Sequence, residues 1–343
     1  MKNKWPATVG LSLILTGAAC LVGCSSIAHR SGSTGTNNGS GPATVAYAFS
    51  YPRGQINEYS TVNGSLLGTL TVPTPYTAQQ FATDGNGQIY VTGCGPTNDG
   101  EVFVFPPNST GAATPSSAFE LGSCGGGIND IYTLVVDPAG QYLYVQGPAI
   151  ADVPQTVYVF PVAANGPPVP VRTLQLSIGG LGAVDADGNI YTSGVAYGSG
   201  CNGVVSVYGP TASGTDAPIS TITIANEQAT GVAVDASGDI FVSVTNCQGT
   251  DWAVEEFAAG ANGAATPINT INLPALPAGA YVSGGCFVRL DAASNIFASL
   301  DIVSPQPLSE TAVIYGFAPT ATGQATPTVT ISDSTAQALF ALN

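Results

Sequence analysis

The chain has 343 residues, only 8% of them charged, and 21 acidic residues against six Lys and Arg give a net charge of −15. This excludes the basic footprint typical of nucleic-acid binding, and it argues against charge-driven binding to anionic lipid. Lys and Glu are too few to cover exposed helix faces, whereas the abundant Val, Ile, Thr and Tyr favour strands. The composition therefore favours an all-β fold.

The N-terminus has the features of an export signal. Lys2 and Lys4 precede an apolar run over residues 7–21, and Leu21-Val22-Gly23-Cys24 follows. This ending resembles the lipobox of bacterial lipoprotein signal peptides, which implies cleavage after residue 23, palmitate-type acylation of Cys24 and a location in the cell envelope. An uncleaved anchor is the alternative, because residues 5–23 nearly reach the roughly 20 apolar residues that span a bilayer.

Residues 24–43 are rich in Gly and Ser and lack periodicity. Such a composition behaves as a flexible coil and predicts a tether between the lipid and the folded part. After cleavage no Lys remains, and four Arg against 21 acidic residues give a net charge of −17. The folded domain is expected over residues 44–343.

A triplet of aromatic, Gly and Pro recurs five times with unchanged spacing. Gly follows the aromatic by six positions, and Pro follows the Gly by four, in Phe105/Gly111/Pro115, Phe160/Gly166/Pro170, Tyr208/Gly214/Pro218, Phe257/Gly263/Pro267 and Phe317/Gly323/Pro327. Constant spacing over five copies indicates one repeated structural unit.

A second signature alternates with the triplet. An apolar strand ends at Asp, a short turn runs to Gly or Ser, and another apolar strand follows, at Asp84, Asp137, Asp185, Asp235 and Asp291. The Asp can bond the amides of its own turn and the Gly supplies a positive φ, which predicts a hairpin.

The two signatures together define a unit of four antiparallel strands, named a to d in chain order. Five such units are complete, and residues 45–49, 55–59 and 66–72 supply b, c and d of a sixth. Residues 338–343 fit its missing strand a, with Asn343 in the Asp position. We therefore predict a six-bladed β-propeller whose first blade is completed by the C-terminal strand, which removes an exposed sheet edge. A solenoid is the structural alternative.

The element V-x-D-x-x-G-x-I-Y-V in these blades resembles the NHL-repeat and gluconolactonase-like superfamily of six-bladed propellers, over residues 45–343. The resemblance is specific for the fold and weak for function, because propellers support many activities.

Loop lengths separate the two faces of the predicted disc. The a–b and c–d turns keep constant spacing, whereas the b–c and d–a connections vary, so ligand binding is expected on the face with variable loops. All five cysteines of the mature fold map to that face. Loop proximity favours the disulfides Cys94–Cys124 and Cys247–Cys286 and leaves Cys201 over, while buried thiols are the alternative.

Catalytic residues are scarce. The single His, His29, lies in the tether, and no Lys remains, so His-based nucleophilic catalysis and Schiff-base chemistry are excluded from the domain. The resemblance to gluconolactonases implies, as an alternative function, a metal-dependent hydrolase. Its oxygen ligands for Ca²⁺ would come from Asp99, Asn129, Asp130, Asn226, Glu227, Asn246, Asp251 and Asp301, which otherwise are ordinary loop polar residues.

The preferred interpretation is a monomeric binding or assembly module that needs no cofactor and binds a protein or an uncharged, glycan-like ligand. Aromatic side chains near the variable loops, with one Arg, could form the platform: Tyr51, Arg53, Tyr76, Tyr197, Trp252 and Tyr281. Asn98, Asn202, Asn246 and Gln248 would flank it. The alternative is that these aromatics pack the loops onto the blades.

Overall fold

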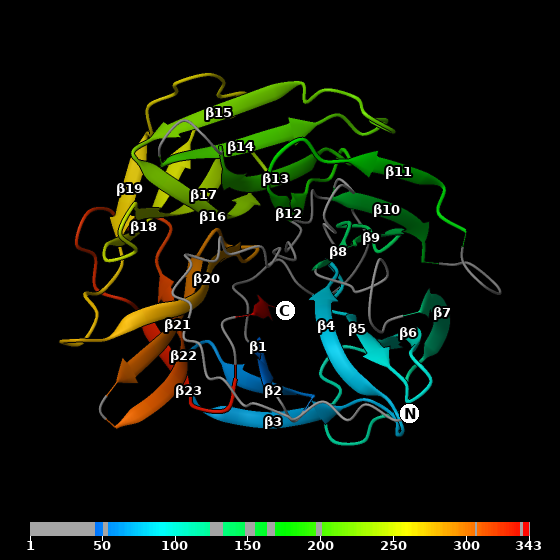
Figure 1. Cartoon of the computed structure of the whole chain (residues 1–343). Helices are drawn as coiled ribbons and strands as arrows, with labels where there is room; N and C mark the ends of the chain where they lie inside the picture. The colour runs from blue at the N-terminus through cyan, green and yellow to red at the C-terminus, as the bar shows by residue number, and fades with distance from the viewer. Residues whose placement is uncertain are drawn as a thin grey trace, which may run out of the picture.

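The computed structural model describes residues 45–50, 54–123, 133–147, 155–162, 169–196, 201–305, 307–336 and 339–342. These residues form 24 strands and no helix, in six sheets of four antiparallel strands arranged as a ring (Figure 1). The inner strands β24, β4, β8, β12, β16 and β20 contact one another in that order around the ring. The six-bladed propeller is confirmed.

Each blade runs from its inner to its outer strand as follows. Blades 1 to 3 contain β24 (Phe340–Leu342), β1 (Val45–Ser50), β2 (Gln55–Ser60) and β3 (Leu66–Thr71); β4 (Thr77–Thr83), β5 (Ile89–Cys94), β6 (Asp99–Phe105) and β7 (Ser117–Ser123); and β8 (Thr133–Val136), β9 (Tyr142–Gln146), β10 (Thr156–Pro161) and β11 (Arg172–Gln175). Blades 4 to 6 contain β12 (Gly180–Val184), β13 (Ile190–Val195), β14 (Asn202–Tyr208) and β15 (Ser220–Ala225); β16 (Glu227–Val234), β17 (Ile240–Asn246), β18 (Trp252–Phe257) and β19 (Asn269–Asn272); and β20 (Tyr281–Leu290), β21 (Ile296–Pro305), β22 (Leu308–Phe317) and β23 (Val329–Asp333).

The Asp turns form as their residues predict. Asp235 Oδ1 accepts hydrogen bonds from the amides of Ser237 (2.8 Å) and Asp239 (2.9 Å), and Gly238 has a φ of +85°. In blade 6 the Gly position holds Ser294, which adopts the same left-handed conformation at a φ of +60°. Each turn thereby satisfies its own amides and joins the inner strand to the second strand of its blade.

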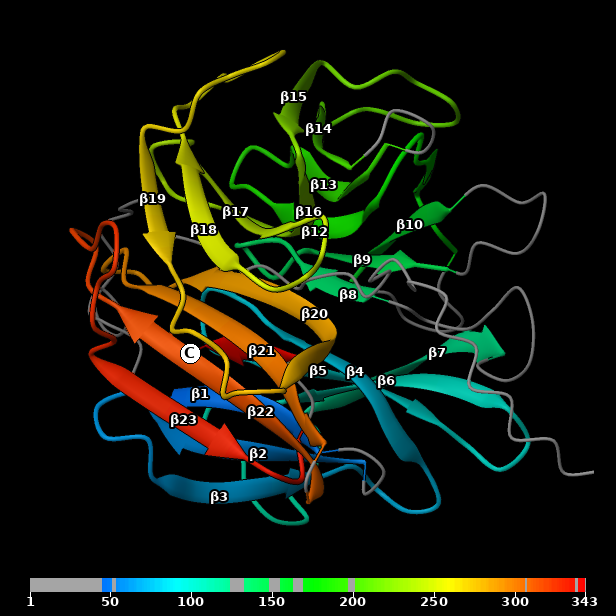
Figure 2. The ribbon, with the colours of Figure 1, turned by 60° about the vertical axis from the view of Figure 1, so that its left-hand side comes forward.

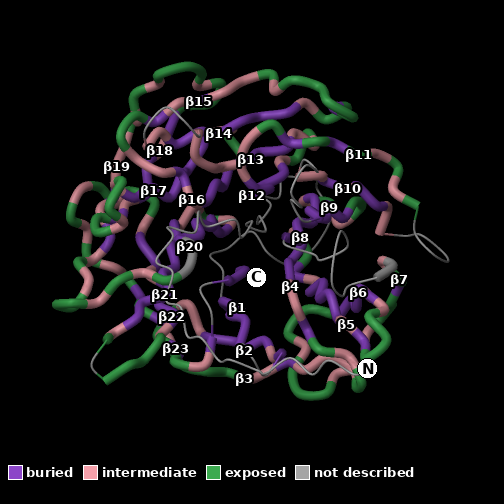
Figure 3. Tube along the Cα trace, in the orientation of Figure 1, coloured by how far each residue is buried: buried purple, intermediate pink, exposed green. Residues whose placement is uncertain are grey.

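The hydrophobic core lies between the blades. Six clusters of buried side chains each combine residues from two neighbouring blades, because alternate residues of a strand point to opposite faces of its sheet. In β1, residues 45–50 are all buried, since both faces of the blade are covered. Figure 3 shows this burial around the inner strands and the exposure of the outer loops.

The recurring Gly of the triplet connects each blade to the one before it. Gly263 in blade 5 donates its N–H to Thr221 O (2.7 Å) and accepts from Thr223 N (2.8 Å), both on β15 of blade 4. Gly111, Gly214 and Gly323 form the same parallel bridge to the preceding outer strand, whereas Gly166 lies outside the described residues. A Cβ on any of these four glycines would meet no atom within 4 Å, so their φ of +56° to +67° is what favours Gly.

The seam between blades 6 and 1 uses different contacts. Here Tyr59 is followed by Gly64 without the Pro, and β24 pairs with β1 near the middle of the ring (Figure 1). Asp333 Oδ2, at the end of β23, accepts hydrogen bonds from Tyr59 Oη (2.5 Å) and Asn57 Nδ2 (2.6 Å) on β2. Burial alone would raise the pKa of Asp333, but the hydrogen bonds from Tyr59, Thr335 and Asn57 outweigh it and lower that pKa. A buried charged hydrogen-bond network therefore replaces the glycine bridge at the seam.

Removing this carboxylate should weaken the ring. We expect Asp333→Ala to lower the free energy of unfolding by about 2–4 kcal/mol, because it leaves the buried Tyr59 hydroxyl and Asn57 amide without their acceptor. Urea unfolding followed by fluorescence measures the change. Glu120→Ala, on the exposed side of the outer strand of blade 2, is the control and should change stability by less than about 0.5 kcal/mol. Equal stability of the two variants would contradict the role given to Asp333.

Candidate functional site

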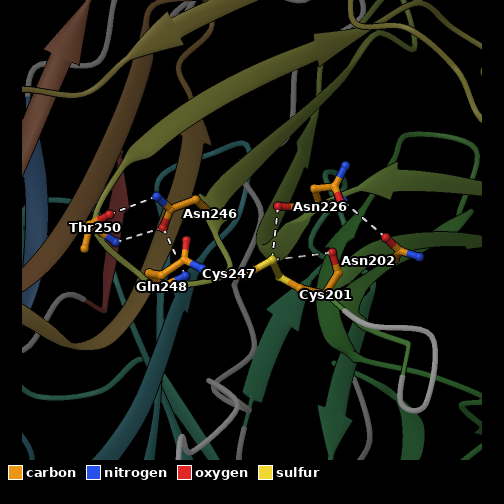
Figure 4. Close-up of a disulfide and its surroundings, with 7 residues drawn as sticks. All are labelled: Cys201, Asn202, Asn226, Asn246, Cys247, Gln248 and Thr250. Atoms are coloured by element: carbon orange, nitrogen blue, oxygen red, sulfur yellow. Dashed lines mark hydrogen bonds between the residues drawn. A yellow bond between two sulfur atoms is a disulfide. The ribbon is translucent and has the colours of Figure 1, made fainter.

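A disulfide on the variable face joins two neighbouring blades. Cys201, directly before β14 of blade 4, is bonded to Cys247 in the b–c loop of blade 5, with 5.6 Å between their Cα atoms (Figure 4). The predicted pair Cys247–Cys286 is therefore wrong, and Cys201 is not left over. Cys286 is a fully buried thiol within β20, in the core between blades 5 and 6. Cys286 thus lies inside a strand and not in the d–a connection, because β20 begins five residues before it.

Only one cysteine of the other predicted pair lies within the described residues. Cys94, at the end of β5, is disulfide-bonded, which confirms its bridged state. Its predicted partner Cys124 lies outside the described residues, so the pairing Cys94–Cys124 stays a prediction.

Amide side chains around the disulfide hold the loops in shape. Asn246 Oδ1 accepts from the amides of Gln248 (3.2 Å) and Thr250 (3.0 Å), and its Nδ2 donates to Thr250 Oγ1 (2.8 Å), as Figure 4 shows. Asn202 Oδ1 accepts from the amide of Asn226 (3.1 Å), whose φ is +63°. Asn246 and Asn202, expected to flank a ligand, therefore already use these atoms within the protein.

The predicted aromatic platform is not assembled from the residues that the structure describes. Trp252 is almost fully buried in the core between blades 5 and 6, and its Nε1 donates to Gly249 O (3.1 Å). Tyr76 packs edge-on against Phe103, and its hydroxyl donates to Asp99 Oδ2 (2.9 Å), the bond that most raises its pKa. Tyr281 is exposed, while Tyr51, Arg53 and Tyr197 lie outside the described residues. The geometry favours packing roles for Trp252 and Tyr76.

The oxygen ligands considered for a metal are dispersed. Asp99 accepts from Tyr76 and Thr97, Asp251 accepts from Asn246, and Asp301 is buried in β21. Asn129 and Asp130 are outside the described residues. Within the described part of the chain, no three His, Cys, Asp or Glu side chains lie close enough to hold a metal ion.

Blade 6 carries a feature that the sequence did not indicate. Its strands β20, β21 and β22 have ten residues each, longer than any other strand described, and Figure 2 shows them side by side. Tyr281 on β20 pairs with Val303 of β21, and Leu308 on β22 pairs with Pro305 of β21, so both side chains lie on one face of the blade 6 sheet. Tyr281 is 53% exposed and Leu308 is 81% exposed. Blade 6 thus presents two exposed apolar side chains at its variable-face end, Leu308 on the long b–c hairpin and Tyr281 on the inner strand β20.

One described cavity lies on the opposite face, beside the a–b turns of blades 3 and 4 and the c–d turn of blade 4. It has a volume of about 490 Å³ and is lined by Asp137, Tyr142, Tyr144 and Arg172 among others. The sequence does hold a signal for it, because Arg172 stands where Ser220 and Asn269 stand in blades 4 and 5, two positions after the repeated Pro.

Comparisons with known proteins support the fold alone. No family model matches the sequence, and no curated protein matches it. A protein of unknown function from Bacteroides caccae is similar in structure, with a TM-score of 0.54, 9% identity and coverage of 88% of this chain and 99% of its own. A quinoprotein alcohol dehydrogenase-like protein from Bacteroides thetaiotaomicron has a TM-score of 0.46, 13% identity and coverage of 87% and 77%. The narrower NHL-repeat and gluconolactonase-like assignment stays a prediction.

The disulfide assignment can be tested directly. Peptide mapping without reduction should recover the Cys201 peptide linked to the Cys247 peptide, and Cys286 should react with iodoacetamide only after denaturation. The double variant Cys201→Ser/Cys247→Ser should lose up to about 4 kcal/mol of stability, as expected for a cross-link spanning 46 residues. A Cys247–Cys286 linkage would overturn the assignment.

Two buried carboxyls should make stability depend on pH. Burial raises the pKa of Glu58 and of Glu255 from 4.5 to about 7, aided for Glu255 by the charge of Glu227, and one oxygen of each accepts no hydrogen bond. The folded state thus holds these protons more tightly than the unfolded state. Their stabilisation is complete below pH 4.5 and is lost as the pH rises through about 7.

We therefore expect urea unfolding to show lower stability at neutral pH than near the pKa of an unfolded Glu, by at least about 1 kcal/mol per group. The double variant Glu58→Gln/Glu255→Gln should flatten this dependence, whereas Glu120→Gln should not. A stability that rises between these two pH values would contradict the expected shifts.

Proposed function

We propose that this protein is an exported propeller, tethered through a lipid on Cys24, that docks a protein partner on its variable face. The propeller fold itself fits a binding or assembly module. The observation that carries the choice of a protein partner is the extended sheet of blade 6, on which Tyr281 of β20 and Leu308 of β22 are exposed on the same face. Exposed aromatic and aliphatic side chains of this kind serve as anchors in protein interfaces.

The surrounding loops support a preformed docking surface. The Cys201–Cys247 bond joins the b–c segments of two neighbouring blades, and Asn246 organises the loop between Cys247 and Asp251. A surface restrained before binding loses less conformational entropy when a partner docks. An uncharged glycan is less favoured on this face, because the amides of Asn202 and Asn246 are already engaged.

The alternative of a metal-dependent, gluconolactonase-like hydrolase gains no support from the described residues. Its candidate ligands Asp99 and Asp251 lie on different blades and already accept hydrogen bonds, Asp99 from Tyr76 and Asp251 from Asn246. In addition, no helix in the described part of the chain is long and apolar enough to cross a membrane. The proposed tethering rests on the resemblance of residues 21–24 to a lipobox.

Site-specific photo-crosslinking in the native host tests the docking proposal. A photoreactive amino acid at Leu308 should give a discrete adduct with one partner protein. The same group at Val62 should give none, since Val62 is equally exposed but lies in a c–d turn on the opposite face. Tyr281→Ser should weaken the adduct at Leu308 at least about fivefold, a loss of about 1 kcal/mol.

Two further results decide the interpretation. In Cys24→Ser the adduct should persist on protein released from the membrane fraction, which separates anchoring from docking. If Leu308 yields no adduct, or the same adducts as Val62, the proposed function is wrong.

A further inference from the structure

The cavity between blades 3 and 4 departs from the repeat in three ways. The first is the length of the a–b turn in blade 3. The amide of Asp137 donates to Tyr142 O (3.0 Å), whereas in blade 2 the amide of Asp84 donates to Gln88 O (3.1 Å). The turn in blade 3 is therefore one residue longer, and Tyr142 takes the position of Gln88. Its partly exposed ring lines the cavity.

The second departure is the carboxylate of Asp137. In blade 4 both oxygens of the corresponding Asp185 are used, because Oδ2 accepts from Tyr191 Oη (3.0 Å) and from Asn189 Nδ2 (2.8 Å). Asp137 Oδ1 accepts from the amides of Gln141 and Tyr142 (both 2.7 Å), but Oδ2 accepts no hydrogen bond from any residue described. Only 9% of Asp137 is exposed, so this oxygen is an acceptor held in the wall of the cavity.

The third departure is Arg172. In blades 4 and 5 the equivalent Ser220 and Asn269 donate to the carbonyls of Ala261 (2.7 Å) and Ala321 (3.0 Å) in the next blade. Arg172 makes the corresponding bond to Ala212 O (3.3 Å) and another to Pro210 O through the same Nη1 atom. A small side chain is thus sufficient for this contact between blades, and the guanidinium brings additional N–H donors into the cavity.

Charge and size define what these groups can bind. Asp137 and Asp187 disfavour an anion in the cavity, and Arg172 disfavours a cation, while no carboxylate among the described residues forms an ion pair with Arg172. Burial raises the pKa of Tyr144 to about 12, so its phenol stays protonated and can donate. Hydroxyl groups, which donate and accept at once, match a set of Asp, Arg, Tyr, Gln and Thr side chains. A cavity of 490 Å³ is within the range of small-molecule sites.

We propose that this cavity binds a neutral mono- or disaccharide. Asp137 Oδ2 accepts from a sugar hydroxyl, Arg172 donates to another, and the ring of Tyr142 packs against the apolar face of the sugar. This site lies on the face opposite the proposed protein-docking surface and is independent of it.

Titration calorimetry of the full mature chain with glucose, galactose, maltose and cellobiose, each as a separate probe, tests the proposal. At least one sugar should bind with a dissociation constant in the millimolar range or below. Arg172→Ser, which copies blade 4 and keeps a donor for the Ala212 carbonyl, should weaken binding at least about tenfold, equivalent to about 1.4 kcal/mol. Asp137→Asn, which keeps the turn acceptor Oδ1, should do the same.

Asp235→Asn is the matched control, because it makes the same change in the turn of blade 5 and should leave binding unchanged. Thermal unfolding of each variant verifies that the domain is folded. Absence of binding for all four sugars would overturn the proposal, as would equal weakening in the control. Tighter binding of gluconate than of glucose would also overturn it, because it would assign an anion to the cavity.

Discussion

Each blade of this propeller buries its two faces only against its two neighbours, so the stability of every blade depends on closure of the ring. The six clusters of buried side chains all lie between blades, and none lies within a single sheet. The repeated Gly supplies the backbone part of this contact by pairing with the outer strand of the preceding blade. Its left-handed φ, and not a lack of space, is the reason that Gly recurs there.

The interactions that depart from the repeat gather around the C-terminal strand that closes the ring and around the seam between blades 6 and 1. Blade 1 takes its inner strand from the C-terminus, and the hydroxyl of Thr83 in blade 2 donates to Leu342 O (2.8 Å) of that strand. Arg289, fully buried in blade 6, places its guanidinium 5.5 Å from the centroid of the Phe340 ring in the same strand. These two contacts anchor a strand of only three residues, while Asp333 ties the outer strand of blade 6 to β2 of blade 1. Short pairing is sufficient because the neighbouring blades hold the strand from both sides.

Because the blades repeat the same pattern, residues and strands that depart from it point to candidate functional sites. Where a position serves only to join blades, a Ser or an Asn is sufficient, so Arg172 stands out as a change of chemistry at a structural position. The longer strands of blade 6 stand out in the same way, because the constant Asp and Gly positions do not require them. The two proposed sites arise from these departures, on opposite faces of one ring.

The turns and hairpins could be predicted from the sequence because they depend on residues close in the chain. The Asp and Gly of each turn act within four or five residues, so the hairpins, the blade count and the origin of strand a in blade 1 were predictable. The partner of Cys247 and the burial of Trp252 were not, since each depends on which loops and strands of neighbouring blades meet in space. The sequence marks Arg172 as a departure from the repeat, but only the packing of blades 3 and 4 shows that it lines a cavity. Spacing along the chain determines the blade, whereas only packing between blades decides which side chains come together.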